Sequence, residues 1–237
     1  MNSEDNIARY KEQYWNNIST VISNILLPSN KKRIYFEQVY SSVYKCVCEG
    51  FSENLRMDIL NLCMSYLHSI NHELDNKVSV LDEPQKVIAT VEELNQCMDA
   101  YLISTEKICS VCSYMNKLQR EDSKENLPQS ALLDCFCRIV CDHRLQHIIS
   151  FIENSPPFTI QPTELRTFFR NLHFTSSGQY AKLYPELFSR YIANVLPEMR
   201  EQDLEAHIRE LSRLQADWRT NMEARCPQQG LKRPAED

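Results

Sequence analysis

The chain has 237 residues, of which 43% are hydrophobic and 24% charged, and its formal charge is −6. This composition allows one or two domains with a sizeable core, while the acidic balance argues against a nucleic-acid-binding protein, in which a basic excess is usual. Only three glycines occur, Gly50, Gly178 and Gly230. Because phosphate-binding loops, dinucleotide fingerprints and nucleophile elbows need clustered glycines, the sequence argues against these classes of enzyme.

The start of the chain, Met1–Asp5, is acidic rather than signal-like. No apolar run reaches the roughly 18–20 residues of a membrane span. Most of the ten cysteines lie inside apolar runs, where cysteine behaves as a small hydrophobic residue. Because the cytosol and nucleus keep thiols reduced, we expect free, buried thiols rather than a disulfide framework. We therefore expect a protein of the cytoplasm, the nucleus or both.

Apolar residues at helical spacing predict three helices in the first third of the chain. The first covers 5–27 and is broken by Pro28-Ser29-Asn30. The second covers 34–48 and is followed by Gly50, which suits a left-handed helix stop. The third covers 52–74, with a serine at its start that can act as an N-cap.

The aromatic content of the second helix is its most informative property. Phe36, Tyr40 and Tyr44 share an apolar stripe with Val39 and Val43. A tyrosine combines a large apolar area with a polar tip, so a pair of them suits a half-exposed docking surface as well as the edge of a core. Periodicity alone leaves both interpretations open.

A very long fourth helix is predicted from Gln85 to about Arg120, which at 1.5 Å per residue would span about 50 Å. Its apolar residues step by four and three along the sequence: Val87, Val91, Leu94, Met98, Tyr101, Thr105, Ile108, Cys112 and Met115. Such a seam is typical of a long bundle helix, and it would also suit coiled-coil-like self-association. A polar linker at 121–130 separates it from a fifth helix at 131–153.

The segment Asn154-Ser155-Pro156-Pro157 is the clearest boundary, because proline lacks the amide donor that a helix interior needs. Beyond it, three further helices are predicted: 163–174, 185–196 and 198–224. The sequence therefore predicts an all-α protein. Its predicted domains are a five-helix bundle at 5–153, a partial second helical repeat at 158–225 and a disordered tail at 226–237.

Four side chains of the predicted fifth helix have the chemistry of zinc ligands: Cys137, Cys141, His143 and His147. The members of each pair lie one helical turn apart, but at about 100° per residue the two pairs project from different faces. Core packing of the cysteines is therefore the main interpretation. The alternative is a small metal- or redox-responsive protein that uses the Cys/His cluster at 135–147. The sequence assigns no catalytic residue and no cofactor.

Several segments resemble the N-terminal region of cullins: Trp15-Asn16-Asn17-Ile18, the helix Tyr35–Tyr44, and Ser113-Tyr114-Met115-Asn116-Lys117. Residues 35–48 are in particular similar to a family member associated with a cyclin-dependent kinase. The resemblance extends over residues 7–225. It implies a cullin repeat, which is a five-helix bundle, followed by the opening of a second repeat.

In cullins the second and fifth helices bind the substrate-receptor adaptor. By position, the resemblance assigns the second-helix contacts to Ile34, Phe36, Glu37, Tyr40 and Tyr44. It implies a non-enzymatic interaction module that regulates cell-cycle kinase or cullin-type ubiquitin-ligase assemblies, with a cyclin-dependent kinase or a cullin adaptor as partner. The acidic charge and the short apolar runs predict no nucleic-acid or membrane partner. The chain ends before the cullin region that recruits the RING partner and accepts the ubiquitin-like modifier, so no ligase activity of its own is expected.

Overall fold

The structure, a computed structural model, describes residues 3–27, 36–118, 127–156, 158–193, 205, 208–216 and 218. These ranges contain helices and turns and no strand, which confirms the predicted all-α class. Residues 1–193 form one compact unit and residues 194–237 a second. Among the described helices, none has the length and apolarity that crossing a membrane requires. The predicted tail at 226–237 and Ile34 lie outside the described residues.

The predicted first helix is one continuous helical segment with a π-helical turn inside it. It comprises α1 (Ser3–Tyr10), η1 (Lys11–Trp15) and α2 (Asn16–Leu26). Its buried residues Tyr10, Tyr14, Ile18 and Ile22 recur at every fourth position. A strict step of four drifts around a helix of 3.6 residues per turn. The wider turn at η1 absorbs the difference and returns the stripe to one face.

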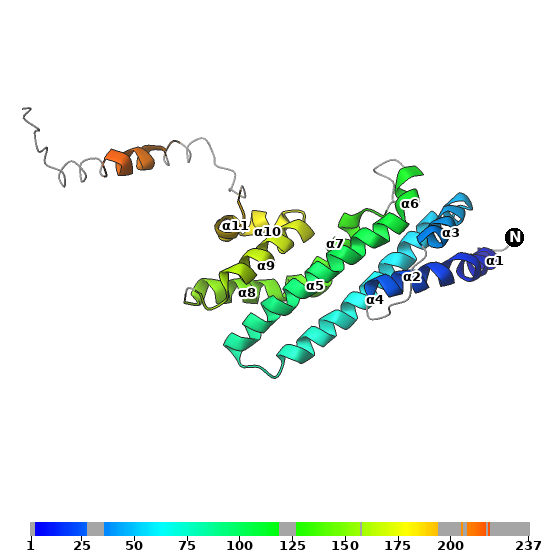
Figure 1. The fold of residues 1–237 in the computed structure, drawn as a ribbon, viewed down its shortest axis with the longest axis horizontal. Helices are drawn as coiled ribbons and strands as arrows, with labels where there is room; N and C mark the ends of the chain where they lie inside the picture. Colours follow the sequence, from blue (N-terminus) through cyan, green and yellow to red (C-terminus); the bar gives the residue numbers. More distant parts are fainter. Residues whose placement is uncertain are drawn as a thin grey trace, which may run out of the picture. The chain divides into compact units, whose positions relative to one another are not determined.

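Two long antiparallel helices run side by side through the first unit (Figure 1). They are α4 (Ser52–Val78) and α5 (Glu83–Val111). The helix α3 (Phe36–Cys48) precedes them and is followed by Gly50, whose φ of +85° is the left-handed stop predicted from the sequence. All nine residues of the predicted fourth-helix seam are buried. Because α2, α4, α7 and α9 pack against α5, this seam is internal to the chain and not free for self-association.

The prediction of a single helix from 85 to 120 is wrong beyond Val111. Cys112 leaves the helical conformation, and a separate short helix, α6 (Ser113–Leu118), follows it. A tertiary contact fixes the direction of α6. The Asn116 side chain accepts a hydrogen bond from the Leu127 amide at 2.9 Å and donates one to the Leu127 carbonyl at 3.0 Å. Periodicity does not reveal such a contact, because it depends on residues eleven positions away.

The predicted fifth helix is also interrupted by a π-helical turn. It comprises α7 (Gln129–Phe136), η2 (Cys137–Cys141) and α8 (Asp142–Asn154). Buried residues again recur every four positions, from Leu132 through Phe136 and Val140 to Ile148. The same geometric argument therefore applies to η2.

Three helices complete the first unit: α9 (Pro162–Thr175), α10 (Gln179–Leu183) and α11 (Pro185–Tyr191). The sequence predicted α9 and the start of α11 but missed the five-residue α10. It also extended α11 too far, because the backbone at Ile192 is already extended. In the second unit, residues 205, 208–216 and 218 are helical, within the predicted range of 198–224.

Buried amides join α9 to α5. Asn95 donates to the Glu164 carboxylate at 2.8 Å and to the Glu164 carbonyl at 3.1 Å. Asn171 donates to the Asp99 carboxylate at 2.8 Å. Both asparagines are buried, and buried polar pairs of this kind specify the register of two helices. The domain boundary predicted near residues 154–157 stays a prediction, for which a test is given in the Discussion.

Candidate interaction surface on α3 and α6

An exposed aromatic cluster lies where α6 packs against α3. It consists of Phe36, Tyr40 and Tyr44 on α3 and Tyr114 on α6, and we name it the tyrosine face. Phe36, Tyr40 and Tyr44 have exposed fractions of 44%, 37% and 44%. The Tyr114 ring lies 4.5 Å from the ring of Tyr44 and 6.4 Å from that of Tyr40, in edge-to-face arrangements. Such pairs hold rings in a defined geometry.

The predicted single stripe of α3 is divided between core and surface. Val39, Val43, Cys46 and Val47 are buried, and α3 packs against α2, α5 and α6. The aromatic residues follow one another every four positions along the edge of this buried stripe and remain outside it. The fold therefore stabilises α3 through its small aliphatic residues and leaves its large aromatic residues available for contact.

Tyr114 completes the face because of the break at Cys112. Its neighbour Met115 is fully buried and anchors the short helix α6. Desolvation, together with the neighbouring Cys48 thiol, raises the pKa of Tyr114. Its phenol is therefore protonated at neutral pH, and it offers a hydroxyl that can both donate and accept a hydrogen bond.

The structure describes four of the five residues that the resemblance assigned to partner binding. Phe36, Glu37, Tyr40 and Tyr44 are exposed on α3, while Ile34 lies outside the described residues. Tyr114 was missed as a member of the site, although its segment was recognised as cullin-like. Because the sequence predicted one continuous helix to residue 120, it gave no sign that this tyrosine approaches α3.

The structure does not bring the four candidate metal ligands together. Cys137 and Cys141 are buried, whereas His143 and His147 are exposed. His147 instead lies 3.4 Å from the Glu83 carboxylate. Over the described residues, no group of three or more His, Cys, Asp or Glu side chains is arranged to hold a metal ion. The cysteines of η2 belong to the packing between this helix and α4.

The nine cysteines within the described ranges are free, and most of them are buried. Burial raises the pKa of Cys46, Cys63 and Cys137 to about 12 and that of Cys109 to about 11. The thiolate is the reactive form of cysteine. These side chains are therefore poor nucleophiles at neutral pH and serve as packing groups.

We expect the protein to lose stability steeply above about pH 9, because its buried thiols must stay protonated in the folded state while unfolded thiols ionise near pH 8.5. A raised folded-state pKa contributes stability that is present below the unfolded pKa and is lost as pH rises toward the folded value. Each such thiol removes about 1.4 kcal/mol per pH unit in this window. Urea unfolding at several pH values between 7 and 10.5 measures how steeply the free energy of unfolding falls with pH. The variant Cys46→Ala lacks one buried thiol, so this slope should be smaller by about 1.4 kcal/mol per pH unit.

Comparison with known proteins identifies two similarities. The family model described as the cullin alpha solenoid domain matches residues 15–192. The chain is 26% identical over 213 residues to CDK2-associated and cullin domain-containing protein 1 of Rattus norvegicus, covering 89% of this chain and 51% of the rat protein. The chain thus spans about half the length of this relative. Both findings agree with the resemblance seen in the sequence.

Proposed function

Since the chain belongs to the cullin family, we propose that it acts by binding other proteins and has no catalytic activity of its own. The proposed partners are a cullin adaptor or a cyclin-dependent kinase, and the proposed place of action is the cytoplasm, the nucleus or both. The first partner is suggested by the position of α3, which corresponds to the cullin helix that meets the adaptor. The second is suggested by the printed name of the rat relative, which describes association with CDK2.

The observation that carries this proposal is the exposure of the tyrosine face. Tyrosines are over-represented among the residues that dominate binding energies, because they bury a large area at a low cost in conformational entropy. In this protein the rings of Tyr40 and Tyr44 both contact Tyr114. These contacts restrict the side-chain conformations before a partner binds, which lowers the entropy cost of binding further. Through such a surface the protein would regulate cell-cycle kinase or ubiquitin-ligase assemblies by occupying their components.

Replacing Tyr40 and Tyr44 together with alanine is expected to weaken partner binding at least tenfold, equivalent to about 1.4 kcal/mol or more. Both rings are exposed, so circular dichroism should show unchanged helix content. The measurement is isothermal titration calorimetry of the purified chain against a purified cullin adaptor and, separately, against purified CDK2 with its cyclin.

The matched control is the double variant Gln38→Ala/Lys45→Ala, which removes two exposed side chains from another side of the same helix. It should bind as the unaltered chain does. If the tyrosine and control variants bind a partner equally well, the tyrosine face does not take part in that interaction. If neither protein binds the unaltered chain, both proposed partners are excluded.

A further inference from the structure

The dipeptide Ser155-Pro156 is the single position in the sequence at which a serine or threonine directly precedes a proline. Proline has no backbone N–H. A protein kinase whose cleft offers no acceptor to the amide after the phosphorylated hydroxyl selects proline there, because any other residue would leave a buried donor unpaired. Kinases of this proline-directed class, to which the cyclin-dependent kinases belong, therefore find one acceptor sequence in this chain.

The backbone at Ser155 already has the conformation that such a cleft accepts. Helix α8 ends at Asn154, and Ser155 follows it with a φ of −87° and a ψ of 151°. The ring of a proline clashes with a helical residue before it, so the sequence itself keeps Ser155 extended. The bond from Ser155 to Pro156 is trans. Because a kinase binds its acceptor segment in an extended form, no helix has to unwind at Ser155 itself.

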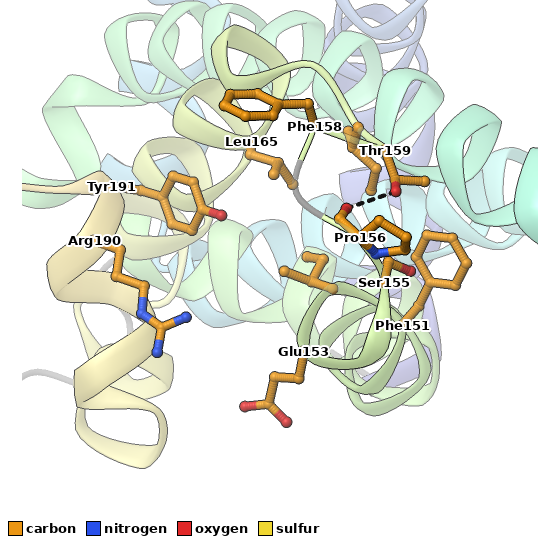
Figure 2. A pocket seen from close by; sticks show the side chains of 11 residues that line it. Phe151, Glu153, Ser155, Pro156, Phe158, Thr159, Leu165, Arg190 and Tyr191 are labelled. Carbon is orange, nitrogen blue, oxygen red and sulfur yellow. Dashed lines mark hydrogen bonds between the residues drawn. The ribbon is translucent and has the colours of Figure 1, made fainter.

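The Ser155 hydroxyl is free to react. Its amide donates to the Phe151 carbonyl at 2.9 Å, which completes α8, but its hydroxyl forms no hydrogen bond with a described residue. The hydroxyls of Ser176 and Ser189, by contrast, donate to carbonyls of the preceding turn at 2.7 and 2.8 Å. Ser155 lines a hollow between the end of α8 and α11, and Pro156 beside it is exposed (Figure 2).

The turn that follows Ser155 is strained, which lowers the cost of opening it. Phe158 has a φ of +71°, a conformation that bulky residues rarely adopt, and its side chain is 82% exposed. The turn is closed by Thr159, whose amide and hydroxyl donate to the Pro156 carbonyl at 3.3 and 2.7 Å. A kinase cleft must extend these residues as well, and release of the strain at Phe158 offsets part of the loss of these two hydrogen bonds.

We propose that Ser155 is a phosphorylation site for a proline-directed protein kinase, with ATP as the phosphoryl donor. The proposal rests on the proposed function, in which a cyclin-dependent kinase is a partner, and it makes the chain a substrate of that partner. The Ser155 hydroxyl oxygen forms a bond to the γ-phosphorus of ATP while the bond between that phosphorus and ADP breaks. The hydroxyl proton passes to the catalytic aspartate of the kinase, and the products are phosphoserine and ADP.

The test is phosphoryl transfer from radiolabelled ATP to the purified full-length chain by CDK2 with its cyclin, with the modified residues located by mass spectrometry. A standard peptide substrate shows that the kinase is active. We expect incorporation to approach one phosphate per chain, located at Ser155, and Ser155→Ala should lower it at least tenfold. Ser150→Ala is the matched control and should leave incorporation unchanged, because Ser150 is exposed on α8 and is not followed by proline.

Two further variants separate recognition of this segment from simple exposure of a hydroxyl. Pro156→Ala keeps the acceptor but introduces an amide N–H, and it should lower kcat/KM for the phosphorylation at least tenfold. Thr159→Val removes the hydroxyl bond that closes the turn, and it should raise kcat/KM about two- to fivefold. An unchanged kcat/KM in Pro156→Ala would overturn the proline-directed assignment. An unchanged or reduced value in Thr159→Val would overturn the requirement that the turn opens.

The same measurements distinguish failure of this proposal from failure of the proposed function. No incorporation into the unaltered chain, or phosphate located only at other residues, overturns the Ser155 site even where calorimetry shows that CDK2 with its cyclin binds the chain. Phosphate at Ser155 without detectable binding in calorimetry supports the site, and it contradicts a stable complex between the chain and this kinase.

Discussion

Replacing Phe169 with alanine is expected to lower the free energy of unfolding by about 3–5 kcal/mol. Phe169 is fully buried in α9. Its ring contacts those of Phe168, Phe188 and Tyr191, with centroid distances of 5.4, 4.9 and 4.7 Å. Truncation would remove all three contacts and leave a cavity. Urea unfolding followed by far-UV circular dichroism measures the loss.

The same variant tests the domain boundary predicted near residues 154–157. Trp15 and Trp218 are the two tryptophans of the chain, so in a Trp218→Phe background fluorescence reports on Trp15 in η1. Because buried amides join α9 to α5, we expect fluorescence and circular dichroism to shift together in one transition. An early transition seen by circular dichroism alone would show instead that α9 to α11 unfold as a separate unit.

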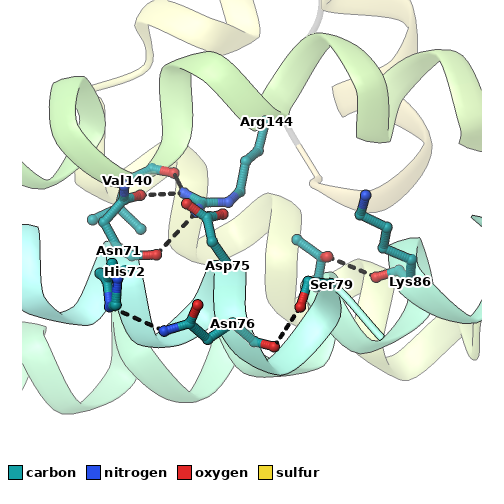
Figure 3. A network of polar contacts seen from close by, with 9 residues as sticks. Asn71, His72, Asp75, Asn76, Ser79, Lys86, Val140 and Arg144 are labelled. Carbon is teal, nitrogen blue, oxygen red and sulfur yellow. Dashed lines mark hydrogen bonds and ion pairs between the residues drawn. The ribbon is translucent and has the colours of Figure 1, made fainter. Parts of the chain in front are cut away.

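Replacing Arg144 with alanine is expected to cost about 2–3 kcal/mol of stability, the scale of a hydrogen-bonded charged group. Arg144 is buried on α8 and reaches across to α4 (Figure 3). Its guanidinium donates to the Asn71 side chain at 2.5 Å and to the Val140 carbonyl at 2.7 Å, and it forms an ion pair with Asp75. Because the Asp75 side chain is 56% exposed, water can solvate it in the variant, which keeps the loss below that of a fully buried pair.

Arg138→Ala is the matched control, since Arg138 is exposed on the neighbouring turn and donates only long bonds of 3.4 and 3.8 Å. It should change the free energy of unfolding by less than about 0.5 kcal/mol. The loss of stability in Arg144→Lys should lie between those of Arg144→Ala and Arg138→Ala. An ammonium group keeps the charge but cannot reproduce the several directed hydrogen bonds of the planar guanidinium. Equal losses in the free energy of unfolding for Arg144→Ala and Arg138→Ala would mean that the Arg144 network does not stabilise the packing of α8 against α4.

Much of the fold could be predicted from apolar spacing, because burial of one face is what makes a helix of a globular protein stable. Helices α3, α4 and α9, and the start of α5, were predicted within a few residues. The errors lie where long-range contacts act. The chain turns at Cys112, and the bond from Asn116 to Leu127 fixes the direction that follows. The short helix α10 has too few residues for a periodic pattern to stand out.

The candidate site was predictable in part. The sequence indicated Phe36, Tyr40 and Tyr44 through their resemblance to cullins, but spacing placed them in the same stripe as the buried valines. Apolar spacing along a helix does not distinguish the residues at the centre of the buried face from those at its edge. Only the packing of α2, α5 and α6 against α3 decides which of its residues remain exposed.

By itself, the sequence determined the helical class, the positions of most helices and membership of the cullin family, because these depend on local spacing and residue order. The tertiary structure alone decided which aromatic residues are exposed, that Tyr114 joins them, and that the thiols and histidines of 135–147 lie apart. The physical reason is that burial and side-chain proximity depend on contacts between residues far apart in the chain, which no local pattern contains.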